Sequence, residues 1–242
     1  MKKIIYLLIT LFVNVSIAQS KSGVVTYKVK KNEVEKSTEY TNDNNSKMIV
    51  LIEQELSQLE FQLSFNKNES VFEGIDELRE DNKNYFKDIA LLAARGNKLF
   101  YSNNLKEEII ESFNFIGETI NIKKNYQDFV WTFLNETKKI ENYNCFKAVC
   151  EVEVLTGSNN QKSKYKMTAW YCPELSFNFG PFESVGLPGL VLEFSTDRII
   201  YYAQKIKFSD KDIVINPPQK GKSMTQEEYN TSAKKAFENS GH

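Results

Sequence analysis

Alternating apolar and polar positions recur along most of the chain after about residue 20, and this alternation predicts β-strands. The segment Gly23–Val29 opens the series with β-branched and aromatic residues at alternate positions. From residue 98 onward, short alternating segments are separated by Asn, Gly and charged residues, which is typical of an antiparallel sheet. We expect strands at 59–63, 71–72, 98–101, 108–115, 118–123, 130–134, 146–155, 165–171, 190–195 and 199–208.

Helical spacing of apolar residues occurs in a few places. Apolar positions three or four apart predict a helix over 47–59, and a loop followed by a helix over 76–94. Gly96 would close the second helix, because glycine adopts the left-handed conformation that ends many helices. The pattern Thr225-x-x-Glu228 is a capping box and predicts a short polar helix near the C-terminus.

These elements predict an α+β, mainly β fold. The expected architecture is a curved, half-barrel-like antiparallel meander sheet with one or two peripheral helices and a C-terminal helical tail. We expect a signal peptide at 1–18 and a single domain over 19–216, with a helical insertion near 76–95. A polar tail over 217–242 would follow Pro217-Pro218.

The N-terminus has the features of a secretory signal. Lys2 and Lys3 precede an apolar run over 4–13 that is too short to span a bilayer of roughly 30 Å. Small residues at Ser16 and Ala18 favour cleavage before Gln19. An N-terminal membrane anchor is the alternative. We therefore expect an exported protein, in the periplasm, associated with the outer membrane or outside the cell.

Charge and histidine content narrow the function classes. The formal net charge is −1, and loss of Lys2 and Lys3 would make it more negative, which argues against a nucleic-acid partner. The single histidine is His242, the last residue of the chain. A Ser-His-Asp triad, a Cys-His pair and a His-rich zinc site need an imidazole held in place, which a chain end does not supply. We therefore predict no catalytic residues, no metal site and no cofactor.

Three cysteines, Cys145, Cys150 and Cys172, lie in a chain expected to reach an oxidising compartment. A hairpin turn at 157–160 would place Cys145 opposite Cys172, and Cys150 opposite Met167. A disulfide needs Cα atoms within roughly 7 Å, which the first pair would satisfy. We expect a Cys145–Cys172 disulfide, and three buried thiols are the alternative.

Aromatic residues cluster in a loop rich in Gly and Pro before residue 190. The loop includes Leu187-Pro188-Gly189-Leu190, a predicted type II turn in which glycine takes the positive φ. Apolar loop residues need a core or a partner to cover them. Together with Trp131 they would form an aromatic groove for an apolar or carbohydrate ligand, or an ordinary β-sheet core. The candidate binding residues are Trp170, Phe177, Phe179, Phe182, Leu187, Pro188 and Leu190.

The same region resembles a known family. Trp170-Tyr171-x-Pro173-Glu174-Leu175, Gly180-Pro181-Phe182 and Gly186-Leu187-Pro188-Gly189-Leu190 resemble the signature of the GLPGLI family. Members of that family are exported proteins of Bacteroidota bacteria with no settled biochemical activity. The resemblance implies an envelope location and outer-membrane receptors as candidate partners, and it supplies no catalytic residues.

Two functions follow as expectations. The first is a non-catalytic exported cell-envelope protein that binds an apolar ligand or an outer-membrane protein partner through the Gly/Pro/Phe-rich loop. The alternative is a carboxylate-dependent secreted hydrolase acting on glycans or peptides. It would use carboxylates such as Glu174, Glu183 and Glu193, provided that two of them lie roughly 5 to 10 Å apart.

Overall fold

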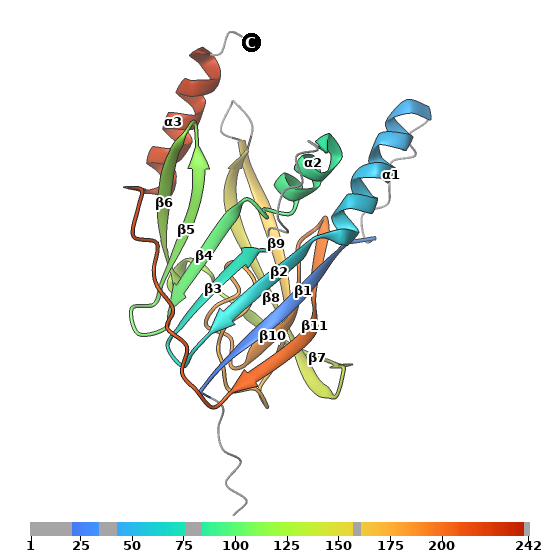
Figure 1. Cartoon of the computed structure of the whole chain (residues 1–242), viewed down its shortest axis with the longest axis vertical. Helices are drawn as coiled ribbons and strands as arrows, with labels where there is room; N and C mark the ends of the chain where they lie inside the picture. The colour runs from blue at the N-terminus through green and yellow to red at the C-terminus, as the bar shows by residue number, and fades with distance from the viewer. Residues whose placement is uncertain (1–20, 34–42, 76–83, 157–160, 240–242) are drawn as a thin grey trace, which may run out of the picture.

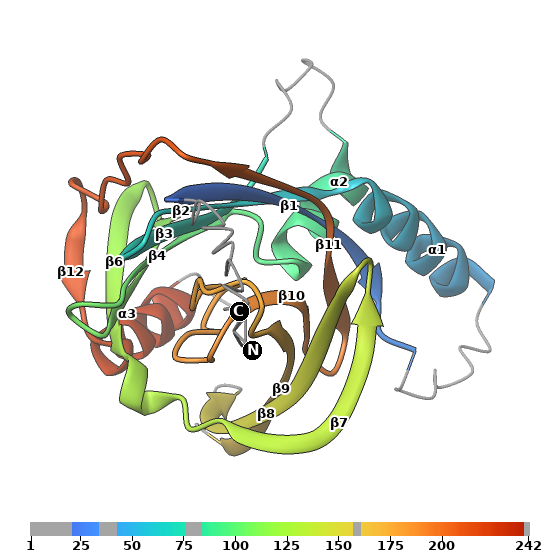
Figure 2. The ribbon, with the colours of Figure 1, turned by 90° about the horizontal axis from the view of Figure 1, so that it is seen from below.

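The computed structural model describes residues 21–33, 43–75, 84–156 and 161–239. These residues form one 12-stranded sheet with three α-helices around it (Figure 1). Strands therefore dominate the structure. Seen from below, the sheet curves around a central loop (Figure 2).

The strands come from two consecutive halves of the chain. The first half contributes β1 (Ser22–Lys31), β2 (Glu60–Phe65), β3 (Glu69–Gly74), β4 (Lys98–Asn103), β5 (Glu108–Phe115) and β6 (Glu118–Asn125). The second half contributes β7 (Thr132–Ile140), β8 (Tyr143–Thr156), β9 (Gln161–Cys172), β10 (Leu190–Ser195) and β11 (Ile199–Ser209). A single 3₁₀ turn, η1 (Tyr126–Asp128), connects the halves. A short strand, β12 (Lys222–Met224), follows near the C-terminus.

The predicted fold class, an α+β antiparallel meander, is wrong. The sheet order is β12-β6-β5-β4-β3-β2-β1-β11-β10-β9-β8-β7, so two meanders are joined where β1 pairs with β11. In addition β12 pairs with β6 in parallel, which makes the sheet mixed. Alternation in a sequence identifies a strand but not its long-range partner, and this is why both pairings were missed.

The parallel pairing depends on a segment that crosses the outside of the sheet. Residues 210–221 run from β11 to β12 over the outer face, as Figure 2 shows. Ser22 Oγ donates a hydrogen bond to the Lys211 carbonyl (2.6 Å), and Asn66 Nδ2 donates to the Ile213 carbonyl (3.1 Å). Ile215 is buried against Tyr101 of β4. These contacts carry the chain back to the far edge of the sheet, where β12 joins β6.

The predicted helices are confirmed with small changes in their bounds. They are α1 (Asp43–Gln58), α2 (Tyr85–Ala93) and α3 (Gln226–Asn239). Residues 76–83 of the expected insertion lie outside the described residues. After α2 it is Arg95, at φ 54°, that takes the left-handed conformation, and not Gly96. The expected role of Gly96 was therefore wrong, and the reason becomes clear from the contacts of Arg95 described below.

The capping box of α3 is confirmed. The Thr225 amide donates to Glu228 Oε2 (2.8 Å), and the Glu228 amide donates to Thr225 Oγ1 (3.2 Å). Tyr229 packs edge-on against Phe113 and Phe115 of β5, each at 5.2 Å between ring centroids. The helix is thus held against the sheet through the ring of Tyr229, and none of its described side chains is buried.

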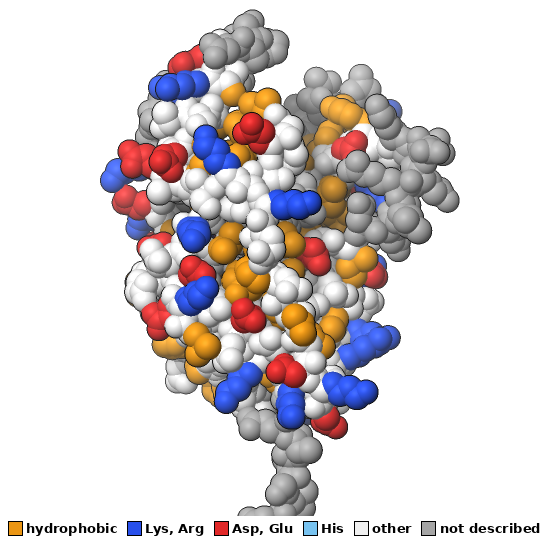
Figure 3. All heavy atoms as spheres, turned by 60° about the vertical axis from the view of Figure 1, so that its left-hand side comes forward, with side chains coloured by type: hydrophobic (Ala, Val, Ile, Leu, Met, Phe, Trp, Pro, Cys, Tyr) orange, Lys and Arg blue, Asp and Glu red, His pale blue; other side chains and the backbone are white. Residues whose placement is uncertain are grey.

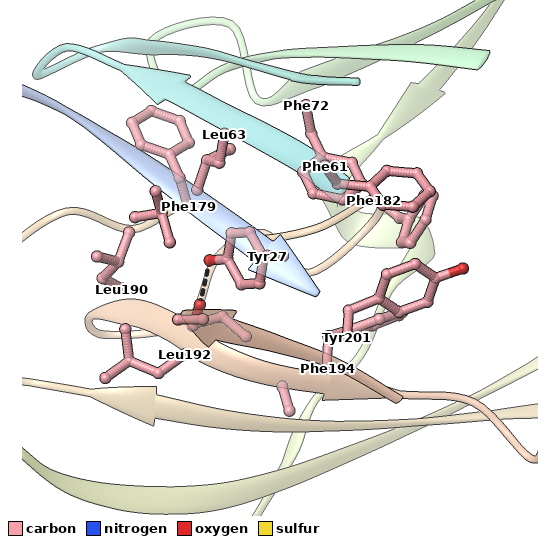
Figure 4. Packing of buried hydrophobic residues seen from close by; sticks show 14 of the residues in the cluster. Tyr27, Phe61, Leu63, Phe72, Phe179, Phe182, Leu190, Leu192, Phe194 and Tyr201 are labelled. Carbon is pink, nitrogen blue, oxygen red and sulfur yellow. Dashed lines mark hydrogen bonds between the residues drawn. The ribbon is translucent and has the colours of Figure 1, made fainter. Parts of the chain in front are cut away.

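The main core lies on the concave side of the sheet. Phe61 of β2, Phe72 of β3 and Tyr201 of β11 point into it and are at most 2% exposed (Figure 4). Tyr27 Oη donates a hydrogen bond of 2.5 Å to the Val191 carbonyl, which satisfies a buried hydroxyl. Burial of each such ring contributes about 1.5 to 3 kcal/mol. The concave face is therefore packed with side chains.

The N-terminal region carries predictions that the structure does not describe. The expected signal peptide at 1–18 lies outside the described residues. Among the residues that are described, none of the helices has the length and apolar character needed to cross a membrane.

Candidate functional site

The segment between β9 and β10, residues 173–189, folds into the concave side of the sheet (Figure 2). We call it the plug loop. Phe179, Phe182 and Leu187 are at most 2% exposed and lie in the main core. Figure 4 shows Phe182 beside Phe61 and close to Tyr201. The plug loop fills the curve of the sheet with its own side chains.

Glycine permits the tight return from the plug loop to β10. Gly189 has φ +151°, and a Cβ at this position would lie 2.1 Å from the Cys172 carbonyl oxygen. The positive φ predicted for Gly189 is confirmed. The Leu190 amide donates a hydrogen bond to the Leu175 carbonyl (3.0 Å), across the base of the plug loop. Leu190 is therefore the first residue of β10, and its amide closes the base of the plug loop.

A cluster of five charged side chains lies where the plug loop meets the first half of the sheet. Glu183 of the loop receives two hydrogen bonds from the Arg95 guanidinium, at 2.9 and 2.7 Å. Lys124 of β6 contacts Glu183 at 2.9 Å and also donates to Glu111 of β5. Lys98 of β4 donates to Glu111 at 2.5 Å. We call these five residues the charge cluster.

Aromatic rings enclose the arginine of the charge cluster. The Arg95 guanidinium carbon lies 4.6 Å from the ring centroid of Phe100 and 4.7 Å from that of Phe182. Such cation–π contacts are stronger when the cation is partly desolvated. Successive loop residues, Phe182 and Glu183, thus hold Arg95 through a ring face and a bidentate ion pair.

Two of the five non-glycine residues with positive φ in the described part of the chain meet at this contact. Arg95 and Phe182 both have φ 54°, in the left-handed region that non-glycine residues rarely adopt. Such conformations persist only where the surrounding contacts enforce them, and they occur often at functional sites. After α2, the left-handed conformation expected at Gly96 is thus found at Arg95, the residue whose side chain binds Glu183.

The carboxylates of the charge cluster are ionised. Burial favours the neutral acid, but Arg95 and Lys124 outweigh it and hold the pKa of Glu183 well below its usual range. For Glu111, burial is likewise outweighed by Lys124 and Arg95, so its pKa is lowered. The pKa of Arg95 is raised, because attraction to Glu183 exceeds the cost of burial. The cluster is a set of fixed charges at neutral pH.

This arrangement bears on the carboxylates singled out as hydrolase candidates. A glycosidase needs one carboxylic acid whose pKa is raised, so that it can donate a proton. Glu183 is instead ionised and paired with cations. Glu193 pairs with Lys138 at 2.7 Å, and Glu174 accepts a hydrogen bond from Asn144 Nδ2 at 3.1 Å. Each candidate is thus engaged by a partner of its own.

The predicted binding residues fall into two groups. Phe179, Phe182, Leu187 and Leu190 are buried in the core, and therefore contact the protein itself. Phe177 and Trp170 are partly buried, and Pro188 is exposed. These last three are the predicted residues that an external molecule could reach.

Trp170 lies three residues before the plug loop and packs, partly buried, against the same core cluster as the loop rings. It is on β9, and the Lys138 ammonium lies 4.3 Å from the centroid of its ring. Lys147 approaches the same ring at 5.7 Å. Cationic side chains thus lie against the indole ring.

The cysteine prediction is half right. Pairing of Phe146 with Tyr171, and of Cys150 with Met167, confirms the expected hairpin register. However, Cys145 and Cys172 are buried free thiols, so the predicted disulfide is wrong. The pairing of β8 with β9 ends at Phe146 and Tyr171, one position before these two cysteines. Burial, followed by the neighbouring Cys172, raises the pKa of Cys145 to about 12.

Four members of the charge cluster were not predicted from the sequence. Glu111 follows Ile109 and precedes Phe113 at alternate positions of β5, and both neighbours are buried. A charged residue in an inward-facing series is the signal that could have identified it. No such sequence signal marks Lys98, Arg95 or Lys124, because their partners lie on other elements. Among the described residues, no group of three or more His, Cys, Asp or Glu side chains is arranged to hold a metal ion.

Two solved structures share the fold. One is described as the "Structure of PNGF-II in P21 space group", with 15% sequence identity, a TM-score of 0.52 and coverage of 88% of this chain. The other is the "Structure of PNGF-II in C2 space group", with 14% identity, a TM-score of 0.51 and coverage of 89%. This chain spans about a third of those chains, 33% and 32%. At such low identity the likeness concerns the fold alone.

Comparison with curated proteins gives no match. A family match does occur in the part of the chain that contains the end of the β8–β9 hairpin, the plug loop and the start of β10. Residues 153–193 match the family described as "Protein of unknown function (Porph_ging)".

Proposed function

We propose that this chain is a non-catalytic, exported cell-envelope protein of the GLPGLI type that binds a protein partner, with outer-membrane receptors as the candidate class. The observation that carries the proposal is the division of the plug loop into a buried part and an exposed part. The buried part completes the core, and the part at the surface is free to contact a partner.

An internal apolar ligand is the less favoured occupant. Phe179 and Phe182 are packed against the protein's own core at 0% and 2% exposure. A ligand would have to displace these rings, which pack against β2, β3 and β11 side chains at centroid distances of 4.7 to 6.5 Å. Tightly packed interiors resist such rearrangement. We therefore place the binding surface on the outside of the molecule.

The proposed surface is centred on Phe177 and Phe208. Their rings are stacked at 6.1 Å, with an angle of 17° between the planes. Phe177 also packs against Phe65 at 4.6 Å, which anchors it to β2. Phe208 of β11 is 36% exposed. Aromatic residues fixed on one side and open on the other are typical anchors of protein interfaces.

The face drawn in Figure 3 is mixed in character. On the face drawn in Figure 3, hydrophobic side chains lie in small groups among charged side chains of both signs. Interfaces that form and dissociate are about as apolar as the rest of a protein surface. Ser176, Asn178 and Lys207, which flank the two rings in the sequence, are exposed, so the proposed partner contact is a small aromatic anchor with polar neighbours.

The hydrolase alternative receives less support from the geometry. Glu183 and Glu111 are held ionised by Arg95 and Lys124, so neither is suited to donate a proton. Their strong pairing with cations indicates a role in holding the plug loop against β5 and β6.

Site-specific photo-crosslinking tests the proposal. A benzophenone amino acid at position 177 keeps an aromatic side chain there. The same probe at Val214, which is 84% exposed in the segment over 210–221, is the matched control. In intact cells, the probe at 177 should give a discrete adduct with an envelope protein that the probe at 214 does not give. The proposal is contradicted if position 177 gives no adduct, or if both positions give the same adducts.

A further inference from the structure

The charge cluster contains more positive than negative charge. Arg95, Lys98 and Lys124 face two carboxylates, Glu111 and Glu183. In the described part of the chain, the ion pairs of the three cations go to these two acids. One positive charge therefore remains uncompensated in a chain whose overall formal charge is −1. An excess charge that is largely removed from water is costly unless a counter-charge is supplied.

The two signs of charge differ in their access to solvent. The carboxylate side chains of Glu111 and Glu183 are 4% and 5% exposed. The side chains of Arg95, Lys98 and Lys124 are 24%, 22% and 16% exposed. A molecule that approaches from solvent meets the cations, with the acids behind them.

The surroundings of the cations are apolar. The Lys98 ammonium lies 4.4 Å from the ring centroid of Phe113, and the Arg95 guanidinium is flanked by Phe100 and Phe182. Electrostatic attraction is stronger beside such low-dielectric walls than in open water. Guanidinium and ammonium groups in this setting suit the oxygen atoms of carboxylate, phosphate or sulfate groups.

We propose that Arg95, Lys98 and Lys124 form a binding site for one oxyanion group, such as a phosphate or a carboxylate. Lys98 is the cation to remove in a test, because its ion pair is with Glu111 alone, whereas Arg95 and Lys124 each contact both carboxylates. Lys98→Gln would leave Glu111 paired with Lys124 and Arg95. This site is separate from the Phe177 surface, and does not depend on the proposed partner.

Calorimetric titration of the purified chain with inorganic phosphate, and separately with acetate, tests the site in chloride-free buffer at constant ionic strength. The two titrations distinguish a preference for phosphate from a preference for carboxylate. The wild-type chain should bind at least one of these anions with saturable one-to-one stoichiometry. Lys98→Gln should weaken that binding at least tenfold. The control Lys162→Gln, at an exposed lysine paired with Glu153, should leave it unchanged.

A second variant should change the anion affinity in the opposite direction. Glu111→Gln removes a negative charge and raises the excess to two, so it should tighten anion binding. The proposal is overturned if the wild-type chain shows no saturable binding of either anion, or if Lys98→Gln binds as tightly as wild type. Equal weakening by Lys162→Gln would indicate nonspecific attraction, and would also overturn it.

Discussion

Glu183 illustrates how a single charged side chain can organise a loop. Its carboxylate is nearly buried and is bound by Arg95 from the α2–β4 connection and by Lys124 from β6. Removing one partner of a buried ion pair leaves the other charge uncompensated, which costs more than the pair itself contributes. At the residue scale, Glu183 is thus expected to stabilise the protein.

The substitution Glu183→Gln should lower the free energy of unfolding by about 3 kcal/mol at pH 7, because Arg95 and Lys124 lose their shared counter-charge. Urea denaturation measures this change. Glu153→Gln, at an exposed pair with Lys162, is the control and should change the stability by less than about 0.5 kcal/mol. Equal effects of the two substitutions would contradict the structural role of Glu183.

The loss of stability caused by Glu183→Gln should depend on pH. The folded pKa of Glu183 lies below that of an unfolded glutamate, about 4.3. Its contribution is therefore fully present above the unfolded pKa, and is lost as the pH falls toward the folded pKa. The stability difference between wild type and Glu183→Gln should narrow as the pH falls from about 5 to 3. A difference that stays constant or widens would contradict the lowered pKa.

At the scale of elements, the sequence predicted strands best where alternation was regular. The bounds of β5 and β10 agree with the expected 108–115 and 190–195. Strand β7 was expected at 130–134, but it extends over Thr132–Ile140. As an edge strand it has mostly exposed residues on both faces, and its register shifts between Phe133 and Thr137. Polar residues on both faces remove the alternation on which the prediction depends.

The candidate site was less accessible from the sequence. Phe179, Phe182 and Glu183 were noticed because they lie together in an unusual loop. Arg95 and Lys124 were not, because each is dozens of residues away from Glu183 and resembles an ordinary surface cation. The contact depends on the curvature of the sheet and on where the loop folds, which are tertiary features. The local sequence pattern thus identified Glu183 but not the two cations that pair with it.

The return from the plug loop to β10 gives an element-scale prediction. Gly189→Ala should lower the free energy of unfolding by about 4 kcal/mol or more, because the new Cβ would meet the Cys172 backbone at 2.1 Å. Gly186→Ala is the matched control: Gly186 has φ +72° and nothing within 4 Å of an added Cβ. The cost there should be about 1 kcal/mol, from the left-handed backbone alone. Thermal and urea unfolding of both variants measure the difference, and equal costs would contradict the tight return.

At the scale of the whole molecule, the plug loop links the two halves of the sheet. It leaves β9 and enters β10, which belong to the second half of the chain. Its side chains Phe182 and Glu183 contact Phe100 of β4 and Lys124 of β6, which belong to the first half. Pairing of β1 with β11 joins the halves through the backbone, and the plug loop joins them through side chains. This double connection indicates that the loop and the sheet unfold together.

Amide hydrogen exchange of the plug loop tests this central claim most directly. The Val185 amide donates to the Glu183 carbonyl, and the Val191 amide donates to the Phe179 carbonyl, each at 2.9 Å. If the loop is part of the core, these amides should exchange as slowly as those of β1 and β2, at the rate of global unfolding. Exchange many times faster than that of β1 and β2 would show that the loop opens independently of the sheet, and would contradict the account.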